Sequence, residues 1–280
     1  MRTASALGSR LSAVGSRLSA FGLGLGLLAT ALPAQDSTVR TPAAPEGSPR
    51  AAVPFAPGER ADYQVKFGPF SVGRGTMDVM GLDTVRGRET WHILFRIRGG
   101  VPGYRVDDRM ESWMDTQTLA SLRFKQDMNE GSRERERHFE IYPGSTYVED
   151  NREPQATVPL PLDDGSFLYF VRTIPLEVGK EYTFDQYFRP DRNPVRIQVL
   201  RKERIKVPAG TFETIVIRPI IKARGVFSED GRAEIWLTDD DNRLMVQMKS
   251  HMKLGSLSLF LRSYTPGKMA TADSTAVAPQ

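Results

Sequence analysis

The sequence predicts an all-β, mainly antiparallel fold: a curled meander that forms a barrel or half-barrel. Apolar side chains recur at every second position in several runs, for example Tyr63, Val65 and Phe67. Such alternation is typical of strands with one buried and one solvated face. Turn-forming pairs such as Arg86-Gly87 and Pro143-Gly144 separate the runs. Many short strands joined by tight turns indicate an antiparallel meander.

The expected elements follow one another across most of the chain. Asp163-Asp164-Gly165 precedes an apolar stretch that Pro175 ends, and an Asp in this position caps free backbone N–H groups. We therefore expect a short helix near residues 164–174, across the sheet or over its open end. One expected strand ends at Phe67, a second has Trp91, Ile93, Phe95 and Ile97 on one face, and a third ends at Leu254. The other expected strands cover 72–84, 105–115, 119–128, 133–142, 195–206, 211–221, 232–238 and 257–264.

Residues 1–34 have the features of a secretory signal peptide. Arg2, Arg10 and Arg17 precede an apolar run from Leu18 to Leu32, and small residues follow as far as Ala34. This order is typical of a cleaved signal, and the run is shorter than the roughly 20 residues of a spanning helix. We expect a periplasmic or otherwise exported protein that is soluble after cleavage, with no stable transmembrane segment. The alternative is an uncleaved N-terminal anchor.

The rest of the chain is expected to divide into three parts. Residues 35–57 are rich in Pro, Ala, Ser and Thr and indicate a disordered linker. Residues 58–265 have no such break and predict a single β-rich domain. Residues 266–280 are expected to be a disordered tail. The chain contains no cysteine, which excludes disulfides, thiolate metal sites and conventional lipid attachment, so the core must supply stability.

The charge balance argues against a nucleic-acid partner. The chain has 38 basic and 34 acidic residues, and removal of the three signal-peptide arginines reduces the excess from four to one. Basic and acidic residues are also interleaved, most clearly in Arg133-Glu134-Arg135-Glu136-Arg137, whereas nucleic-acid binding needs a basic stripe. On a strand this segment has one Arg face and one Glu face. It predicts a solvated edge or protruding hairpin; the alternative is a docking edge for a partner or anionic headgroups.

No residue set in the sequence dictates a reaction. His92, His138 and His251 lie on separate expected strands without ligand-like spacing, so we expect no metal and no cofactor. The densest ionisable cluster is Asp107-Asp108-Arg109 with Glu111. Two carboxylates beside an Arg are able to perform acid–base chemistry, but ion pairs in a barrel wall are the commoner outcome. No catalytic residue is predicted.

Two segments are similar to each other. Residues 111–115 carry Trp113 and lead through a polar turn to Leu119, and residues 234–238 carry Trp236 and lead through an acidic turn to Leu244. Because the turns differ in length, shared hairpin chemistry is favoured over duplication as the explanation.

Five motifs in order carry a resemblance to a known family. The chain resembles the domain of unknown function 3108 family of exported bacterial proteins. The resemblance implies an envelope location and a β-rich fold, and it supplies no catalytic residues. The hairpins with Trp are also similar to those of lipoprotein-carrier-type periplasmic proteins, whose curved sheets wrap an apolar cavity under a helical lid. The motifs are residues 55–59 with Tyr63 and Val65, residues 108–113, Ser166 with Tyr169 and Arg172, residues 207–212, and residues 235–240.

These observations favour a non-enzymatic binding protein of the envelope for a lipid or other apolar ligand. Trp113 and Trp236 are expected to line a cavity, with Arg109, Tyr169 and Arg172 near its mouth. A structural or assembly factor with a filled barrel and a protein partner in the envelope is the alternative. A hydrolase of envelope polymers is a third reading, which requires carboxylates clustered in one cleft.

Overall fold

The computed structural model describes residues 50–222, 233–252 and 255–269. The predicted signal peptide lies outside the described residues, as do most of the expected linker and most of the expected tail. Within the described part of the chain, no helix is long and apolar enough to cross a membrane.

The described residues form one 14-stranded antiparallel sheet, as the alternation predicts. Its strands lie in the order β8-β7-β6-β5-β4-β3-β2-β1-β14-β13-β12-β11-β10-β9. The strands are β1 (Arg60–Phe67), β2 (Phe70–Val85), β3 (Arg88–Val101), β4 (Tyr104–Asp115), β5 (Ser121–Glu130), β6 (Arg133–Tyr142), β7 (Thr146–Glu149), β8 (Gln155–Ala156), β9 (Glu181–Phe184), β10 (Val195–Val207), β11 (Gly210–Ile220), β12 (Glu234–Thr238), β13 (Met245–Met252) and β14 (Gly255–Thr265).

The first and last strands meet in the middle of the sheet. β1 pairs with β2 on one side and with β14 on the other. The chain runs outward to β8, crosses to the opposite edge at β9, and returns strand by strand to β14. The two edges do not close as a ladder. An isolated parallel bridge joins Leu162 to Tyr187 between them, and the Phe188 N–H donates to the Leu162 carbonyl at 2.9 Å. The result is a half-barrel.

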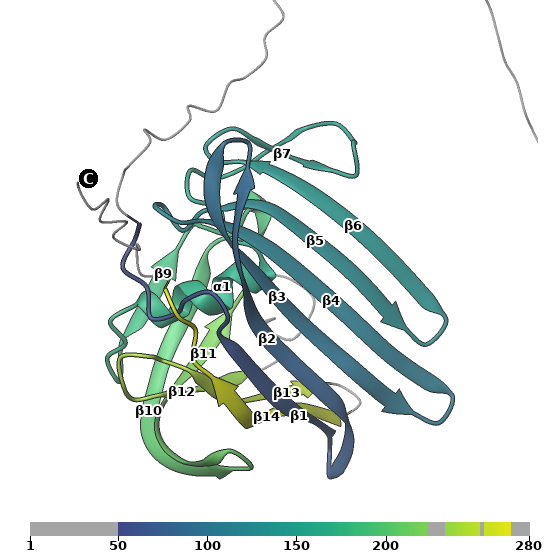
Figure 1. Ribbon diagram of the computed structural model, residues 1–280, viewed down its shortest axis with the longest axis vertical. Helices are drawn as coiled ribbons and strands as arrows, with labels where there is room; N and C mark the ends of the chain where they lie inside the picture. The colour runs from purple at the N-terminus through teal and green to yellow at the C-terminus, as the bar shows by residue number, and fades with distance from the viewer. Residues whose placement is uncertain (1–49, 223–232, 253–254, 270–280) are drawn as a thin grey trace, which may run out of the picture. The chain divides into compact units, whose positions relative to one another are not determined.

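The predicted helix lies inside the curl of the sheet. It comprises α1 (Asp164–Phe170) and the 3₁₀ turn η1 (Val171–Thr173); a second 3₁₀ turn, η2 (Pro190–Arg192), precedes β10. Figure 1 shows α1 between strands β2–β6 and strands β9–β12. A Cβ added to Gly165 would come within 2.5 Å of Ser112 Oγ on β4, so the helix packs directly on the sheet. The face of the sheet toward α1 is called the inner face below.

The inner face is filled by large side chains from the strands and the helix. Trp91, Ile93 and Phe95 alternate inward along β3, as predicted, and all are buried. Phe55 contacts both Trp91 and Tyr169 edge to face, with ring centroids 5.5 and 5.0 Å apart. Burial of each such side chain contributes about 1.5–3 kcal/mol. The described core is therefore continuous from β3 across α1.

The segment of alternating charge forms a free edge. Within the described sheet, β6 pairs with β7 only along Phe139–Tyr142, which leaves residues 133–137 bonded on one side, to β5. Arg133 and Arg135 face inward and register with Glu130 and Met128, whereas Glu134 faces outward beside Asn129. This arrangement is the protruding, solvated hairpin that the sequence predicts.

Candidate ligand-binding site

A buried carboxylate anchors α1 to the sheet. Asp163 caps the helix by accepting from the N–H groups of Gly165 and Ser166, each at 2.8 Å. It also accepts from Ser112 Oγ at 2.5 Å and from Ser121 Oγ. Burial raises the pKa of Asp163 to about 6, against the opposing effect of the two serine hydrogen bonds. The sequence shows the cap; the serines come from β4 and β5 and carry no sequence signal.

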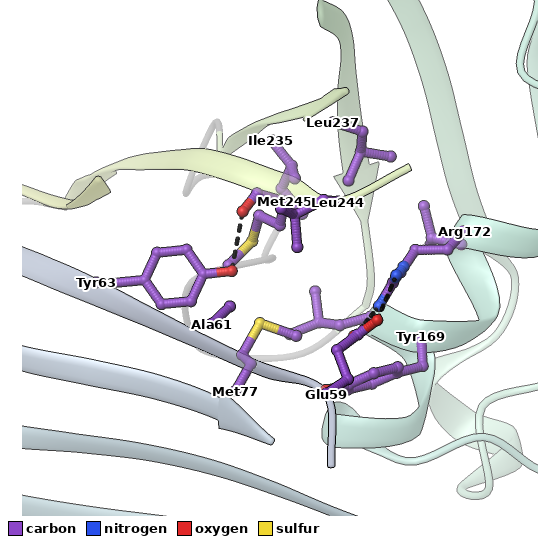
Figure 2. Close-up of a pocket in the computed structure, with 12 residues that line it drawn as sticks. Glu59, Ala61, Tyr63, Met77, Tyr169, Arg172, Ile235, Leu237, Leu244 and Met245 are labelled. Atoms are coloured by element: carbon purple, nitrogen blue, oxygen red, sulfur yellow. Dashed lines mark hydrogen bonds and ion pairs between the residues drawn. The ribbon is translucent and has the colours of Figure 1, made fainter. Parts of the chain in front are cut away.

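Arg172 is buried in an ion pair with Glu59, so it is a cross-link rather than an exposed binding group. Its Nη1 lies 2.5 Å from Glu59 Oε1, and about 3% of each side chain is exposed (Figure 2). The guanidinium also donates to the carbonyl oxygens of Pro54 and Asn242, both at 3.0 Å. Tyr264 OH donates to Glu59 at 3.1 Å. Burial by itself would lower the pKa of Arg172. The hydrogen bonds to Glu59 and the negative charge of Glu59 raise this pKa, and the net shift is upward.

Tyr169 lies in the core beside this pair. Its side chain is 1% exposed, and burial raises the pKa of its phenol well above the usual value. The nearby cavity has a volume of about 10 Å³ and is lined by Tyr63, Met77, Leu168 and Met245 among others (Figure 2). A cavity needs about 10–15 Å³ to admit one water. This space between α1 and the described strands is therefore too small for a lipid chain.

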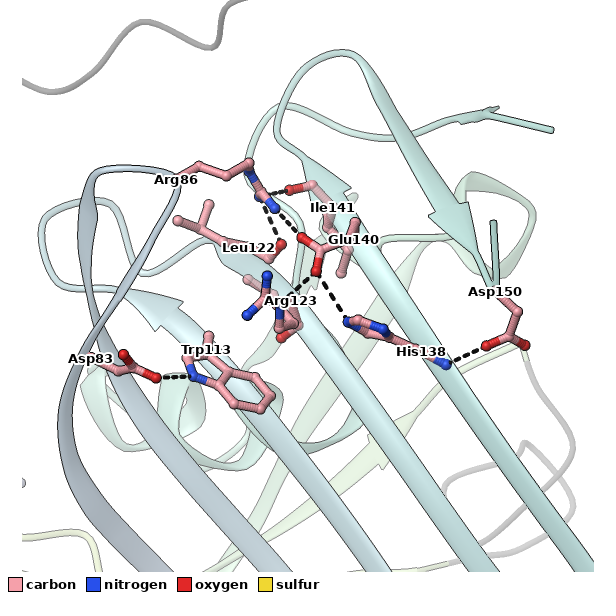
Figure 3. Close-up of polar contacts among 10 residues, drawn as sticks. Asp83, Arg86, Trp113, Leu122, Arg123, His138, Glu140, Ile141 and Asp150 are labelled. Carbon is pink, nitrogen blue, oxygen red and sulfur yellow. Dashed lines mark hydrogen bonds and ion pairs between the residues drawn. The ribbon is translucent and has the colours of Figure 1, made fainter. Parts of the chain in front are cut away.

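Trp113 lies on the outer face of the sheet, not on the inner face where it was expected. Its indole stacks on His92 with ring centroids 4.4 Å apart, and its N–H donates to Asp83 Oδ2 at 2.8 Å (Figure 3). Arg123 and Lys125 cover the ring at 5.6 Å. The hydrogen bond from Trp113 lowers the pKa of Asp83. Long basic side chains, together with Val85 and Leu122, thus bury this Trp outside the main core.

Trp236 has the same arrangement on the outer face in the other half of the sheet. Its N–H donates to Glu203 Oε1 at 2.5 Å, and Arg201 and Lys249 cover the ring at 5.8 and 5.3 Å. In each half the carboxylate partner lies on the second strand before the one that carries the Trp. In each half the pairing register with the next strand also shifts directly after the Trp. The similarity seen in sequence therefore extends beyond the two hairpins to their carboxylate partners.

Arg109 is also on the outer face, where it pairs with Glu111 at 3.1 Å. The hydrolase reading needs Asp108 and Glu111 in one site, but three positions apart on a strand they point to opposite faces. Asp108 accepts from the Asn129 N–H at 3.0 Å, whereas Glu111 contacts His92 at 2.9 Å. Burial, and next the charge of Glu130, raise the pKa of Asp108 to about 6. The two carboxylates share no cleft.

The five predicted ligand-binding residues therefore separate into an inner pair, Tyr169 and Arg172, and an outer set, Arg109, Trp113 and Trp236. β4 and β12, which carry the two tryptophans, have five strands between them in the sheet, so the outer set does not converge. A ligand-binding role for the five residues stays a prediction.

Sequence reasoning missed two surface features at the ends of neighbouring hairpins. The first is apolar: Phe67 and Phe70 pair across one turn and are 36% and 71% exposed, and Val101 and Tyr104 pair across another and are 50% and 48% exposed. By alternation Phe67 and Val101 belong to the inner face, beyond the core. The signal available in the sequence was a large apolar residue on each side of a Pro-Gly or Gly-Pro turn.

The second feature is a groove of about 630 Å³ on the outer face of β1–β4. Its charged lining is arginine-rich, with five arginines and three aspartates. These are Arg60, Arg74, Arg96, Arg98, Arg105, Asp62, Asp78 and Asp107.

The fold and these surfaces define a class of protein: an open, curled all-β half-barrel with a packed interior and accessible strand ends. The chain belongs to the DUF3108 family of proteins of unknown function, whose family model matches residues 62–262. No curated protein matches its sequence.

Comparison with solved structures finds one similar fold and two weaker likenesses. A β-barrel-like protein of domain of unknown function DUF1849 from Brucella abortus is similar with a TM-score of 0.51, at 11% identity over 78% of this chain and 100% of that chain. A putative lipoprotein from Parabacteroides distasonis has a TM-score of 0.35 at 13% identity, covering 78% and 100%. A hypothetical protein from Chlamydia trachomatis has a TM-score of 0.33 at 7% identity, covering 77% and 90%. At 11% identity, the first likeness supports the fold alone.

Proposed function

We propose that the protein is an exported, non-enzymatic binding protein of the cell envelope that holds a lipid or other apolar ligand. The ligand lies against the exposed apolar ends of the β1–β2 and β3–β4 hairpins rather than in an enclosed cavity. One observation carries this proposal: Phe70 and Tyr104 are 71% and 48% exposed, while the cavity beside α1 has only about 10 Å³.

The exposed cluster offers apolar surface that an acyl chain is able to cover. β2 and β3 are neighbours up to the pair Gly73 and Gly99, so the two hairpin ends adjoin. An aromatic side chain buries about 150–250 Å² when fully covered, and each Å² of apolar surface contributes about 25 cal/mol. Covering the exposed parts of Phe70 and Tyr104 thus contributes about 6 kcal/mol before the costs of association are deducted. The exposed parts of Phe67 and Val101 add to this apolar surface.

Co-purification tests this proposal. One portion of the purified protein is extracted with organic solvent and the extract is examined by mass spectrometry. A second, unextracted portion is melted with and without fatty acid or phospholipid. We expect co-purified lipid and a rise in melting temperature, both lost in Phe70→Ser/Tyr104→Ser. Met80→Ser/Leu82→Ser is the matched control, since Met80 and Leu82 are 55% and 39% exposed elsewhere on β2. No lipid and no thermal shift in the unmodified protein would overturn the proposal.

The filled interior and the free edge of β6 favour a second candidate, an envelope assembly factor that docks a partner strand along residues 133–137. Unpaired N–H and C=O groups on an edge are able to bond an added strand. A photo-crosslinker at Glu134 is expected to give one discrete adduct in cells, absent when the crosslinker is at Glu213, an exposed residue of β11. Equal adducts at both positions, or none at Glu134, would count against this role.

A further inference from the structure

The arginine-lined groove on the outer face of β1–β4 has two electrostatically different ends. At one end the arginines are matched by carboxylates. Arg60 contacts Asp62 at 2.9 Å and Asp78 at 2.9 Å, and Arg96 makes a bidentate pair with Asp107 at 2.8 and 2.9 Å. Two of the five arginines of the groove, Arg60 and Arg96, thus make the shortest ion pairs with its three aspartates.

The other end, near the hairpin turns, carries an excess of positive charge. Among the described residues, Arg74 and Arg105 have no ion-pair or hydrogen-bond partner on their side chains. Arg98 has a 3.3 Å contact with Asp107, which is already bonded to Arg96. Arg98 is 62% exposed at its side chain, and both Arg74 and Arg105 are exposed. Asp107 is bonded to Arg96 and also interacts with Arg98 and Arg105, so this end of the groove keeps more positive than negative charge.

Two of these arginines face each other across neighbouring strands. Arg74 on β2 lies directly opposite Arg98 on β3, a position in which like charges destabilise a sheet. Beside them Gly73 and Gly99 are paired, and a Cβ on either would clash with the facing backbone. This part of the groove floor is bare backbone beneath charged side chains. On its other side Arg98 lies directly opposite Asp107, so Arg74 is the arginine that adds like charge at this position.

We propose that this end of the groove, formed by Arg74, Arg98 and Arg105, binds the phosphate group of a phosphorylated ligand. A guanidinium presents its donors in a planar fork that suits phosphate oxygens. Several guanidinium groups together are a better match for a tetrahedral phosphate dianion than for a single carboxylate ligand. The site lies on the outer face of the same strand ends whose inner side carries Phe67 and Val101. It is thus separate from the apolar surface of the proposed function and does not depend on it.

Calorimetry on the exported protein tests the site, with inorganic pyrophosphate as one probe and phosphatidylglycerol vesicles as another. The groove variant is Arg74→Gln/Arg98→Gln/Arg105→Gln. The matched control is Arg152→Gln/Arg204→Gln/Arg262→Gln, which removes the same charge from exposed arginines outside the groove. We expect at least tenfold weaker binding in the groove variant and less than twofold change in the control. Both variants alter exposed side chains only, and circular dichroism checks that they fold.

The two probes separate the two sources of phosphate. Saturable binding of pyrophosphate alone identifies a soluble phosphorylated ligand, and binding of phosphatidylglycerol vesicles but not phosphatidylcholine vesicles identifies an anionic lipid headgroup. Either result supports the site if the groove variant abolishes it. Binding of neither probe, or an equal loss in both variants, overturns the site. Loss of the phosphate site with lipid co-purification intact leaves the proposed function standing, and the reverse result leaves the phosphate site standing.

Discussion

Arg172 and Glu59 form a buried ion pair with N and O atoms 2.5 Å apart, although 113 positions separate them in the chain. Arg172 follows α1 and Glu59 precedes β1. The pair therefore joins the crossover segment to the centre of the sheet, and the same guanidinium bonds the carbonyl oxygens of Pro54 and Asn242. Removal of one partner leaves a buried charge without compensation, which is costly in a low-dielectric interior.

Replacement of Arg172 by Met is expected to lower the free energy of unfolding by about 3–5 kcal/mol. Equilibrium urea unfolding followed by circular dichroism measures the loss. The control is Arg204→Met, since Arg204 pairs with Glu213 at the surface, with 71% and 67% of the two side chains exposed; there we expect less than about 1 kcal/mol. Similar losses in the two variants would show that the Arg172–Glu59 pair is not a structural cross-link.

Asp163 makes stability depend on pH. Burial raises its pKa in the folded protein to about 6, above the value of an unfolded Asp near 3.9, so the folded state binds the proton more tightly. The contribution of Asp163 to the free energy of unfolding is therefore greatest below about pH 4. It falls as the pH rises through 6, by roughly 2–3 kcal/mol in all. Urea unfolding at pH 4.5 and 7.5 measures the difference, which we expect to shrink in Asp163→Asn. An unchanged difference would contradict the assignment.

The indole hydrogen bonds of Trp113 and Trp236 are expected to couple energetically to their carboxylates. Trp113→Phe and Asp83→Ala each remove one partner of a hydrogen bond to a charged group, at a cost of about 1 kcal/mol at this partly exposed site. The double variant should cost less than the sum, by about 0.5–1 kcal/mol. The matched cycle is Trp236→Phe with Glu203→Ala. Additive losses in both cycles would show that the paired arrangement contributes no coupling.

Processing of the N-terminus tests the predicted signal peptide. The exported protein is expected to begin within a few residues of Ala34, because small residues precede the cleavage point of a signal. Intact mass measurement of the released protein gives the start. Arg2→Glu/Arg10→Glu/Arg17→Glu should retain the protein in the cytoplasm, whereas Arg204→Glu should not. Release of the protein at full mass would favour the uncleaved N-terminal segment instead.

Several elements were predictable because their cause is local. The alternation of Trp91, Ile93 and Phe95 predicts a strand and its buried face, since side chains alternate along any strand. The cap at Asp163 predicts the start of α1, because the capped N–H groups lie two and three positions further on. The strict alternation of Arg133–Arg137 predicts an exposed hairpin with two differently charged faces. In each case the residues that interact are close in sequence.

The placement of the tryptophans was not local. Because side chains alternate along a strand, Trp113 lies on the other face of β4 from Ser112 and Met114. The large indole was expected on the inner face. In the structure the small Ser112 faces inward, because Gly165 of α1 packs against it and Asp163 accepts its hydroxyl. Trp113 therefore faces outward, where His92 and Lys125 cover it. The position of the helix, 50 residues further along the chain, decided which face of β4 became the core.

The sequence by itself thus determined the strands, the helix, the absence of disulfides and the membership of a β-rich family, because these depend on composition and on neighbours within a few residues. Tertiary structure alone decided that the interior is filled beside α1, that Arg172 meets Glu59, and that Arg74 faces Arg98 across the groove. Those relationships depend on strand register and on the crossover from β8 to β9. Register brings distant residues together through backbone hydrogen bonds that leave no mark in the local sequence pattern.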